Sequence, residues 1–388
     1  MTGQLIKVRT DNRRPKGMND TFFQQSSNEL APRRRSRIVM VGGIPIGGDA
    51  PITVQSMTRT QTSDVAATVA QIQQLEQAGC DIVRVAISDE KAARAIPAIK
   101  AQIRIPLVAD VHFDHRLALL AIEAGADKIR INPGNIKTQR HLFCILEQAS
   151  KRNIPIRIGI NAGSLESELM NRYGHPCAEA LVASALKSIE RCERWGFASL
   201  VVSLKSSDVP TMIDAYRMIA TQIDYPLHLG ITEAGVGTLG LIKNSIGIGA
   251  LLKSGIGDTI RVALTGDPRD EVLAGRMILQ ALRLRRSVME IVSCPTCGRS
   301  SIDVAHIVAE LRRRFADHSR RLRVAVMGCM VNGPGEARQA DIGVAGGPQR
   351  AVLFVHGRPI KKIAHQMILD ELCKAIANYD SDDDQFEE

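Results

Sequence analysis

The chain has few aromatic residues and no long apolar run. Phe, Trp and Tyr make up 3% of its 388 residues, with a single Trp. Proteins that hold single-stranded nucleic acid stack bases on aromatic rings, so this scarcity argues against that role. No apolar stretch approaches the ~20 residues that span a bilayer, and the N-terminal residues lack the apolar segment of a secretory signal. We therefore expect a cytoplasmic protein that binds neither membrane nor nucleic acid.

Cysteine is also sparse for a disulfide framework. Eight cysteines in a chain of this length, without an export signal, favour reduced thiols or metal ligands. The formal net charge is +9, and residues 1–37 hold nine Lys and Arg against three acids. Six acids follow Tyr379, so the charges of the two ends cancel and the body itself is basic. We expect a disordered basic lead over 1–37, an acidic tail over 379–388, and a phosphorylated small molecule as the partner of the basic body.

Short β-branched runs recur through the first two thirds of the chain, each followed by a helical pattern. The eight runs are 52–57, 82–87, 106–112, 128–132, 155–160, 199–205, 226–232 and 259–264. Their starts are separated by the length of βα units, and eight such units close a barrel that has no open edge. A doubly wound open sheet is the competing α/β arrangement. We predict a (β/α)8 TIM barrel over 38–283.

Polar residues lie within and just after these predicted strands. They are Arg84, Asp110, His112, Arg130, Asn132, Arg157, Asn161, Ser203, Lys205, His228, Glu233 and Arg261. An unpaired Arg inside a barrel is very costly, so four Arg and a Lys on different strands predict one anion site at the C-terminal mouth. Guanidinium groups suit phosphate; scattered salt bridges at the rim are the plainer alternative. Glu233 is either a counter-ion of these cations or a proton donor.

A second group of chemically active residues follows the predicted barrel. Cys294 and Cys297 form a Cys-x-x-Cys pair, Cys329 lies in a Gly-rich loop, and Glu336 follows seven residues later. Three thiolates and one weaker oxygen ligand suit a four-iron cluster with one exchangeable corner, whereas structural zinc prefers a fourth Cys or a His. We predict a small α+β domain over 284–378 whose folding the metal assists.

Several segments together resemble one known family. They are PITVQSMT, DIVRVAI, PLVADVHFD, KIRINPGNI, PIRIGINAGSLE, PLHLGITEAG, GIGDTIRVAL, SCPTCGR and GCMVNGPGEA. From about Arg37 to about Lys374, their order and spacing are similar to those of bacterial 4-hydroxy-3-methylbut-2-enyl diphosphate synthases. The resemblance implies a TIM barrel followed by a cluster domain that resembles a sulfite-reductase half-domain.

The resemblance also implies roles for individual residues. Cys294, Cys297, Cys329 and Glu336 would hold a [4Fe-4S] cluster. The diphosphate would bind Arg84, Arg130, Arg157, Asn161, Lys205 and Arg261. Glu233 would assist protonation. Ala263 departs from the family, which often has Ser after the arginine of the eighth strand. One hydroxyl contact to phosphate is therefore missing, and a backbone amide or Thr265 would have to replace it.

The implied activity is an iron–sulfur oxidoreductase of the methylerythritol phosphate route to isoprenoids. It would open and dehydroxylate 2-C-methyl-D-erythritol 2,4-cyclodiphosphate with two electrons, giving 4-hydroxy-3-methylbut-2-enyl diphosphate. Flavodoxin or ferredoxin would be the electron donor, and the family's assembly is a head-to-tail homodimer. Two other functions fit the residues alone. One is a non-redox barrel enzyme for a phosphorylated or pterin-like substrate with a structural zinc, and the other is a zinc-ribbon nucleic-acid-binding protein.

Overall fold

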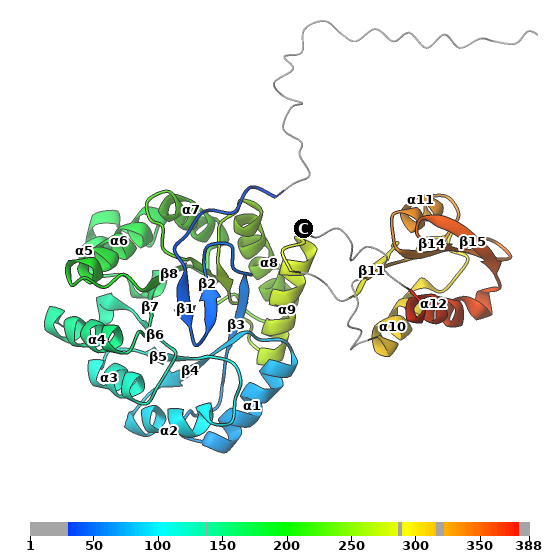
Figure 1. Ribbon diagram of the computed structural model, residues 1–388. Helices are drawn as coiled ribbons and strands as arrows, with labels where there is room; N and C mark the ends of the chain where they lie inside the picture. Colours follow the sequence, from blue (N-terminus) through cyan, green and yellow to red (C-terminus); the bar gives the residue numbers. More distant parts are fainter. Residues whose placement is uncertain (1–29, 137, 286–288, 316–321, 380–388) are drawn as a thin grey trace, which may run out of the picture.

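A computed structural model describes residues 30–136, 138–285, 289–315 and 322–379. Eight parallel strands form its first region (Figure 1). They are β3 (Thr53–Met57), β4 (Ile82–Ile87), β5 (Leu107–Val111), β6 (Lys128–Ile131), β7 (Ile156–Asn161), β8 (Leu200–Lys205), β9 (His228–Leu229) and β10 (Thr259–Ile260). Their order is β8-β7-β6-β5-β4-β3-β10-β9, and a parallel bridge between Val202 and Leu227 joins β8 to the start of β9. The ring confirms the predicted barrel and excludes the doubly wound sheet.

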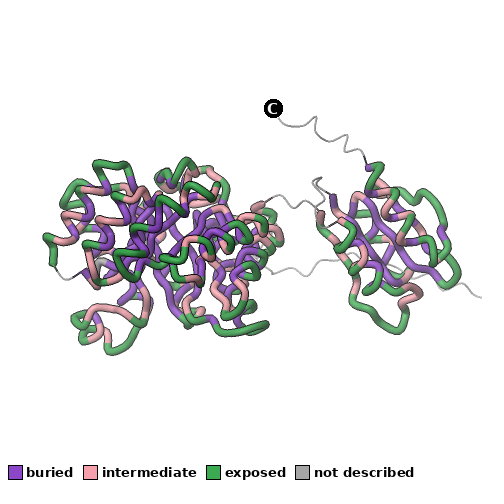
Figure 2. The backbone as a smooth tube through the Cα atoms, turned by 90° about the horizontal axis from the view of Figure 1, so that it is seen from below, coloured by how far each residue is buried: buried purple, intermediate pink, exposed green. Residues whose placement is uncertain are grey.

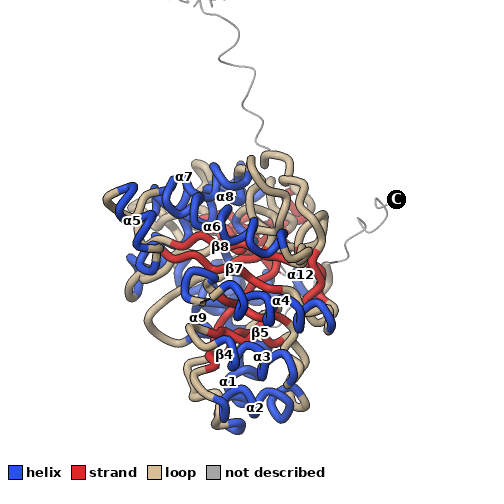
Figure 3. Tube along the Cα trace, turned by 90° about the vertical axis from the view of Figure 1, so that its left-hand side faces the viewer, coloured by secondary structure: helices blue, strands red, loops and turns tan. Residues whose placement is uncertain are grey.

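Helices cover the outside of this ring, as Figure 3 shows for α1 to α4. They are α1 (Val65–Gln77), α2 (Glu90–Lys100), α3 (His115–Glu123), α4 (Gln139–Lys151), α5 (Ser167–Tyr173), α6 (Ala178–Arg194), α7 (Val209–Ala220), α8 (Gly237–Lys253) and α9 (Pro268–Ala281). Aspartates cap several of them, because a carboxylate accepts the N–H groups that the first turn leaves unpaired. Asp64, the N-cap of α1, accepts from the Ala67 N–H at 3.0 Å.

A hairpin that the sequence pattern did not predict closes the N-terminal end of the barrel. It consists of β1 (Val39–Val41) and β2 (Ile44–Ile46). Val41 and Ile46 pack against Ile82 and Val108 in a buried cluster of their own, apart from the main barrel core. Apolar side chains thus fill this end of the barrel axis, and they leave the C-terminal end for polar side chains.

The segment 30–37 lies against the same end, held by hydrogen bonds. The Arg33 and Arg34 guanidinium groups pair with Asp258 at 2.9 and 3.6 Å, and the Ser36 hydroxyl donates to the same carboxylate at 2.9 Å. The backbone N–H of Arg37 donates to Asp224. The prediction of a disordered lead was therefore wrong for this segment. Its basic run is part of the barrel because a buried carboxylate, distant in sequence, binds it. The rest of the expected lead lies outside the described residues.

The second region is a five-stranded mixed sheet with helices. Its strands are β11 (Met289–Ser293), β12 (Leu322–Met327), β13 (Ile342–Ala345), β14 (Ala351–Val355) and β15 (Arg358–Ile363), paired in this order. Its helices are α10 (Val304–Arg314), α11 (Gly333–Arg338) and α12 (Ile368–Ala377). A mixed sheet with separate helices is the α+β arrangement that was predicted for this part of the chain. This sheet has its own buried interior (Figure 2), and its core shares no described residue with that of the barrel.

None of the helices in the described part of the chain is both long and apolar enough to cross a membrane.

Candidate active site

A small polar cavity lies at the C-terminal mouth of the barrel. Its volume is about 160 Å³, and all six side chains predicted to hold an anion line it, together with others from neighbouring strands. The lining residues are Arg84, Asp110, His112, Arg130, Arg157, Asn161, Ser203, Lys205, Ile231, Thr232, Arg261 and Ala263. They come from β4 to β8 and from the residues just after β9 and β10, because every strand of the barrel ends at the same rim. The alternative of scattered rim salt bridges does not describe this convergence.

Asp110 is the centre of the polar contacts in this cavity. Its carboxylate accepts from Arg130 at 3.2 Å and pairs with Arg84 at 3.7 Å. Burial alone would raise the pKa of Asp110, but Arg84, His112 and Arg130 hold it well below its usual range. His112 lies 2.6 Å from the Arg130 guanidinium. One carboxylate therefore fixes two arginines and remains ionised while it does so.

Arg157 and Arg261 are held by side chains of β3 and α9. Arg157, almost fully buried, donates to the side-chain oxygen of Gln55 at 3.1 Å. Arg261 lies 3.3 Å from both carboxylate oxygens of Glu271 on α9. Burial lowers the pKa of Arg84 to about 10, and burial next to Arg261 lowers the pKa of Lys205. The cations in this cavity thus repel one another and are shielded from solvent. An entering anion would reduce that repulsion.

Two glycines make room for these long side chains. A Cβ on Gly159 would meet the guanidinium of Arg130, with Nη2 at 2.9 Å. A Cβ on Gly230 would lie 2.8 Å from Lys205 Nζ and 2.6 Å from the Arg261 carbonyl. Arg130 also donates to the Gly159 carbonyl at 3.2 Å. Arg130 and Lys205 therefore lie over positions in or just after the neighbouring strand that have no side chain.

Glu233 lies on the loop after β9, beside Thr232 of the cavity. It is exposed, it does not line the described cavity, and its backbone has a φ of 53°. A left-handed conformation is unusual for Glu and is often retained at functional loops.

Ala263, at the position where the resemblance led us to expect Ser, lines the cavity. Its N–H donates to the Asn244 side chain at 3.2 Å, and its carbonyl accepts from the same amide at 3.1 Å. Asn244 is a buried residue of α8. The Ala263 amide is therefore already engaged and cannot replace the hydroxyl contact. Thr265, the other residue expected to replace it, is not among the residues that line the described cavity.

The predicted cluster ligands lie in the second region, the three cysteines on loops after parallel strands and Glu336 on a helix. Cys294 follows β11, Cys329 follows β12, and Glu336 lies in α11. The Gly328 N–H donates to Cys294 Sγ at 3.1 Å, so the two cysteine loops touch. A backbone hydrogen bond from Val331 lowers the pKa of Cys329, helped by the Asn332 backbone and Arg299. Such donors favour the thiolate, which is the form that binds metal.

The four side chains do not converge on one point. All three cysteines are free thiols, Cys297 is exposed, and no three His, Cys, Asp or Glu side chains in the described ranges lie close enough to hold a metal. A Cβ on Gly328 would clash with Ser300, so this loop position packs too closely for any side chain. The donor types and the touching loops fit an iron–sulfur cluster, while the convergence of the ligands is not seen.

Comparisons with known proteins cover almost the whole of both regions. The family model for the GcpE TIM-barrel domain matches residues 36–276, and that for the GcpE protein C-terminal domain matches residues 290–378. The chain belongs to the GcpE family. A protein of Caldanaerobacter subterraneus subsp. tengcongensis is 56% identical to this GcpE chain over 89% of this chain and 97% of its own length. A protein of Fusobacterium nucleatum subsp. nucleatum is 51% identical over the same shares. Both are named 4-hydroxy-3-methylbut-2-en-1-yl diphosphate synthase (flavodoxin).

Among solved structures, the GcpE chain is similar to dihydropteroate synthase from Stenotrophomonas maltophilia. The identity is 15% and the TM-score is 0.48, over 64% of this chain and 97% of that chain. A likeness at this level carries no functional argument, so it lends no support to the alternative of a pterin-like substrate.

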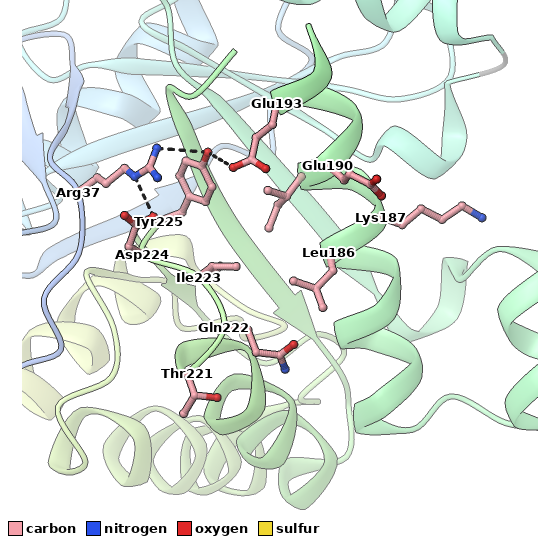
Figure 4. Close-up of a pocket in the computed structure, with 11 residues that line it drawn as sticks. Arg37, Leu186, Lys187, Glu190, Glu193, Thr221, Gln222, Ile223, Asp224 and Tyr225 are labelled. Carbon is pink, nitrogen blue, oxygen red and sulfur yellow. Dashed lines mark hydrogen bonds and ion pairs between the residues drawn. The ribbon is translucent and has the colours of Figure 1, made fainter. Parts of the chain in front are cut away.

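A more spacious cavity of the GcpE chain lies elsewhere, at the N-terminal end of the strands (Figure 4). It measures about 780 Å³, and its lining includes Arg37, Glu193, Asp224 and Tyr225. There Arg37 pairs with Asp224 at 2.8 Å, and the Tyr225 hydroxyl donates to Glu193 at 2.7 Å. These opposite charges already satisfy one another, unlike the unbalanced cations of the mouth. The smaller cavity at the mouth is therefore the one whose charge an anion would balance.

Proposed function

We propose that this chain converts 2-C-methyl-D-erythritol 2,4-cyclodiphosphate into 4-hydroxy-3-methylbut-2-enyl diphosphate, with flavodoxin as the electron donor. Its GcpE relatives are named as this diphosphate synthase, and their names specify flavodoxin. The structural observation that carries the proposal is the convergence of Arg84, Arg130, Arg157, Lys205 and Arg261 on one cavity. Two phosphate groups on one small molecule match such a concentration of cations.

In this proposal the cavity binds and orients the diphosphate. Arginines offer paired N–H donors to phosphate oxygens, and Asn161 adds a side-chain amide at the same rim. Oriented with its amide oxygen toward Arg130, Asn161 accepts from Nη2 at 3.2 Å, which fixes both groups. When the ring opens, negative charge grows on the departing phosphate oxygen. Fixed cations around that oxygen lower the barrier because they need no reorganisation.

We further propose that Cys294, Cys297, Cys329 and Glu336 hold a [4Fe-4S] cluster. Three thiolates match the ligands that such clusters use, and the contact of Gly328 with Cys294 supports a shared loop site. When bound, such a cluster would supply electrons one at a time and a Lewis-acidic iron. Glu336 suits the exchangeable position because a carboxylate holds soft iron less firmly than a thiolate does. Glu233 is proposed as the residue that delivers a proton.

A head-to-tail homodimer is proposed as the assembly, so that the second region of one chain covers the barrel mouth of another. Exposed apolar side chains support an interface on the barrel. Five of them lie on α8 and the residue before it and two on α9, namely Val236, Leu239, Leu241, Ile242, Ile246, Leu273 and Met277. Soluble monomers rarely leave so many large apolar side chains together on neighbouring helices.

Anaerobic turnover of the cyclodiphosphate tests the activity. Protein purified without air is supplied with reduced flavodoxin, and the linear diphosphate is measured. Arg157→Met should lower kcat/KM strongly, whereas Arg152→Met, on the exposed end of α4, should not. Protein that contains about four irons and four sulfides per chain supports the cluster. One zinc per chain, or no turnover by iron-loaded protein, would overturn the proposal.

A further inference from the structure

The barrel contains a buried lysine that the proposed function does not use. Lys128 begins β6, has no exposed surface, and its Nζ has no hydrogen-bond partner in the described structure. It does not line the mouth cavity. In register, its neighbour on β5 is Val108, which belongs to the apolar cluster that closes the N-terminal end. Lys128 thus lies along the barrel axis between the apolar plug and the polar mouth.

The groups that act on Lys128 are cationic. They are Arg157 of β7 and Arg84 of β4, both of which line the mouth cavity. His228 of β9 also feels Lys128, and burial keeps that imidazole neutral by lowering its pKa. Gln55 of β3, already bonded to Arg157, has an unpaired Nε2 and adds no negative charge. Burial first, and then Arg157 and Arg84, lower the pKa of Lys128 well below its usual range.

The charges around the axis and mouth are far from balanced. Six cationic side chains stand against two carboxylates in the described barrel: Arg84, Lys128, Arg130, Arg157, Lys205 and Arg261 against Asp110 and Glu271. Arginine does not deprotonate in proteins, so only the lysines can relieve this excess. Lys205 reaches the cavity and can be hydrated there, whereas Lys128 cannot.

We propose that Lys128 is an uncharged amine in the free protein and takes up a proton when a diphosphate binds to Arg157 and Arg84. The inference rests on the proposed diphosphate site. The entering anion brings at least two negative charges beside the two arginines, and so it removes the repulsion that holds the amine neutral. The proton comes from solvent. Because binding and protonation are linked, the protonated amine in turn strengthens anion binding. Lys128 is thus a positioning group for charge and does not touch the substrate.

Calorimetric titration with inorganic pyrophosphate tests this linkage. Binding heats are measured at one mildly alkaline pH in two buffers with different heats of ionisation, for the wild type and for Lys128→Met. Their difference cancels the anion's own proton exchange, and it should show up to a full proton more taken up by the wild type. Lys128→Met should bind pyrophosphate more weakly, and the gap should close as the pH rises. Lys151→Met, at an exposed lysine of α4, should match the wild type.

The outcomes separate the two proposals. If pyrophosphate gives no saturable binding to either protein, the diphosphate site itself is wrong. If both proteins bind pyrophosphate with equal proton uptake, the site stands and the inference about Lys128 is wrong.

A second measurement guards against a variant that folds poorly. The folded-state pKa of Lys128 lies below its unfolded value of about 10.4, so the unfolded chain binds the additional proton between these two values. As the pH rises through that window, the folding constant of the wild type should therefore increase by up to about tenfold per pH unit. Lys128→Met should lack this gain in urea unfolding of the ligand-free protein. Equal slopes in the two proteins would also overturn the inference.

Discussion

Replacing Glu271 by Gln tests how the Arg261 guanidinium is positioned. Glu271 is a buried residue of α9, the helix that follows β10. Its carboxylate accepts from Arg261 Nη2 at 3.3 Å, from the Ser56 hydroxyl at 2.9 Å and from the Leu264 N–H at 3.1 Å. The substitution keeps the shape of the side chain. It removes the negative charge and turns one accepting oxygen into a donor that faces Arg261 or Ser56.

The size of the effect follows from these contacts. A hydrogen bond to a charged group contributes roughly 1.5–3 kcal/mol, and Arg261 and Glu271 are only 16% and 3% exposed. Ser56 can reverse its role and accept, so the loss is confined to Arg261. We expect the free energy of unfolding to fall by about 2 kcal/mol. Where the freed guanidinium leaves its place at the cavity, KM should rise by roughly tenfold or more, since 1.4 kcal/mol corresponds to tenfold.

Urea unfolding and steady-state kinetics of the same preparations measure the two effects. Glu147→Gln is the matched control, because it removes an exposed pair with Lys151 on α4 and should change stability by less than about 0.5 kcal/mol. Glu271→Gln should raise KM more than it lowers kcat, since Arg261 is proposed to bind substrate before and during the reaction. A loss of stability without any change in KM would refute the positioning role.

Three further changes have directions set by the structure. Gly159→Ala should displace Arg130 and raise KM several-fold with little loss of fold, because the new Cβ meets that guanidinium; unchanged kinetics would contradict this. Asp110→Asn should flatten the acid side of the stability profile. The lowered folded-state pKa of Asp110 means that its contribution is present above the unfolded value of about 3.9 and is lost as the pH falls toward the folded one, as urea midpoints against pH would show. Glu336→Cys should retain a cluster by iron analysis but lose turnover, and undiminished turnover would remove the case for an exchangeable carboxylate.

Much of the barrel follows from local patterns, because buried parallel strands are short β-branched runs and helices begin at capping aspartates. β4 has the predicted bounds, and the six anion-site residues share one cavity because strand ends converge whatever their spacing in the chain. Residues outside the strand ends were beyond such reasoning. Glu271 and Asn244 lie on the helices that flank β10 in the chain, and the packing of these helices brings them to Arg261 and Ala263. The β1–β2 hairpin has three-residue strands, too short for a periodic signal.

Strands of the second region were harder to predict where they lack a hydrophobic pattern of their own. β15 is largely exposed and rich in charged residues, with an unbroken run of exposed positions from Arg358 to Lys362. It has neither the alternation nor the apolar run by which strands are found. It is a strand because β14 supplies its hydrogen bonds. Edge strands of this kind are placed by their neighbour.

The hairpin and the segment 30–37 close the N-terminal end of the described barrel and leave its C-terminal mouth as the way to the cations. Val41 and Ile46 close the axis at one end, while Arg33 and Arg34 fasten the chain across that end through Asp258. In the proposed reaction, reactant and product are both diphosphates, and both must pass through this mouth. Product must therefore leave the mouth cavity before the next reactant binds. Accumulated product competes directly with reactant for the same cations.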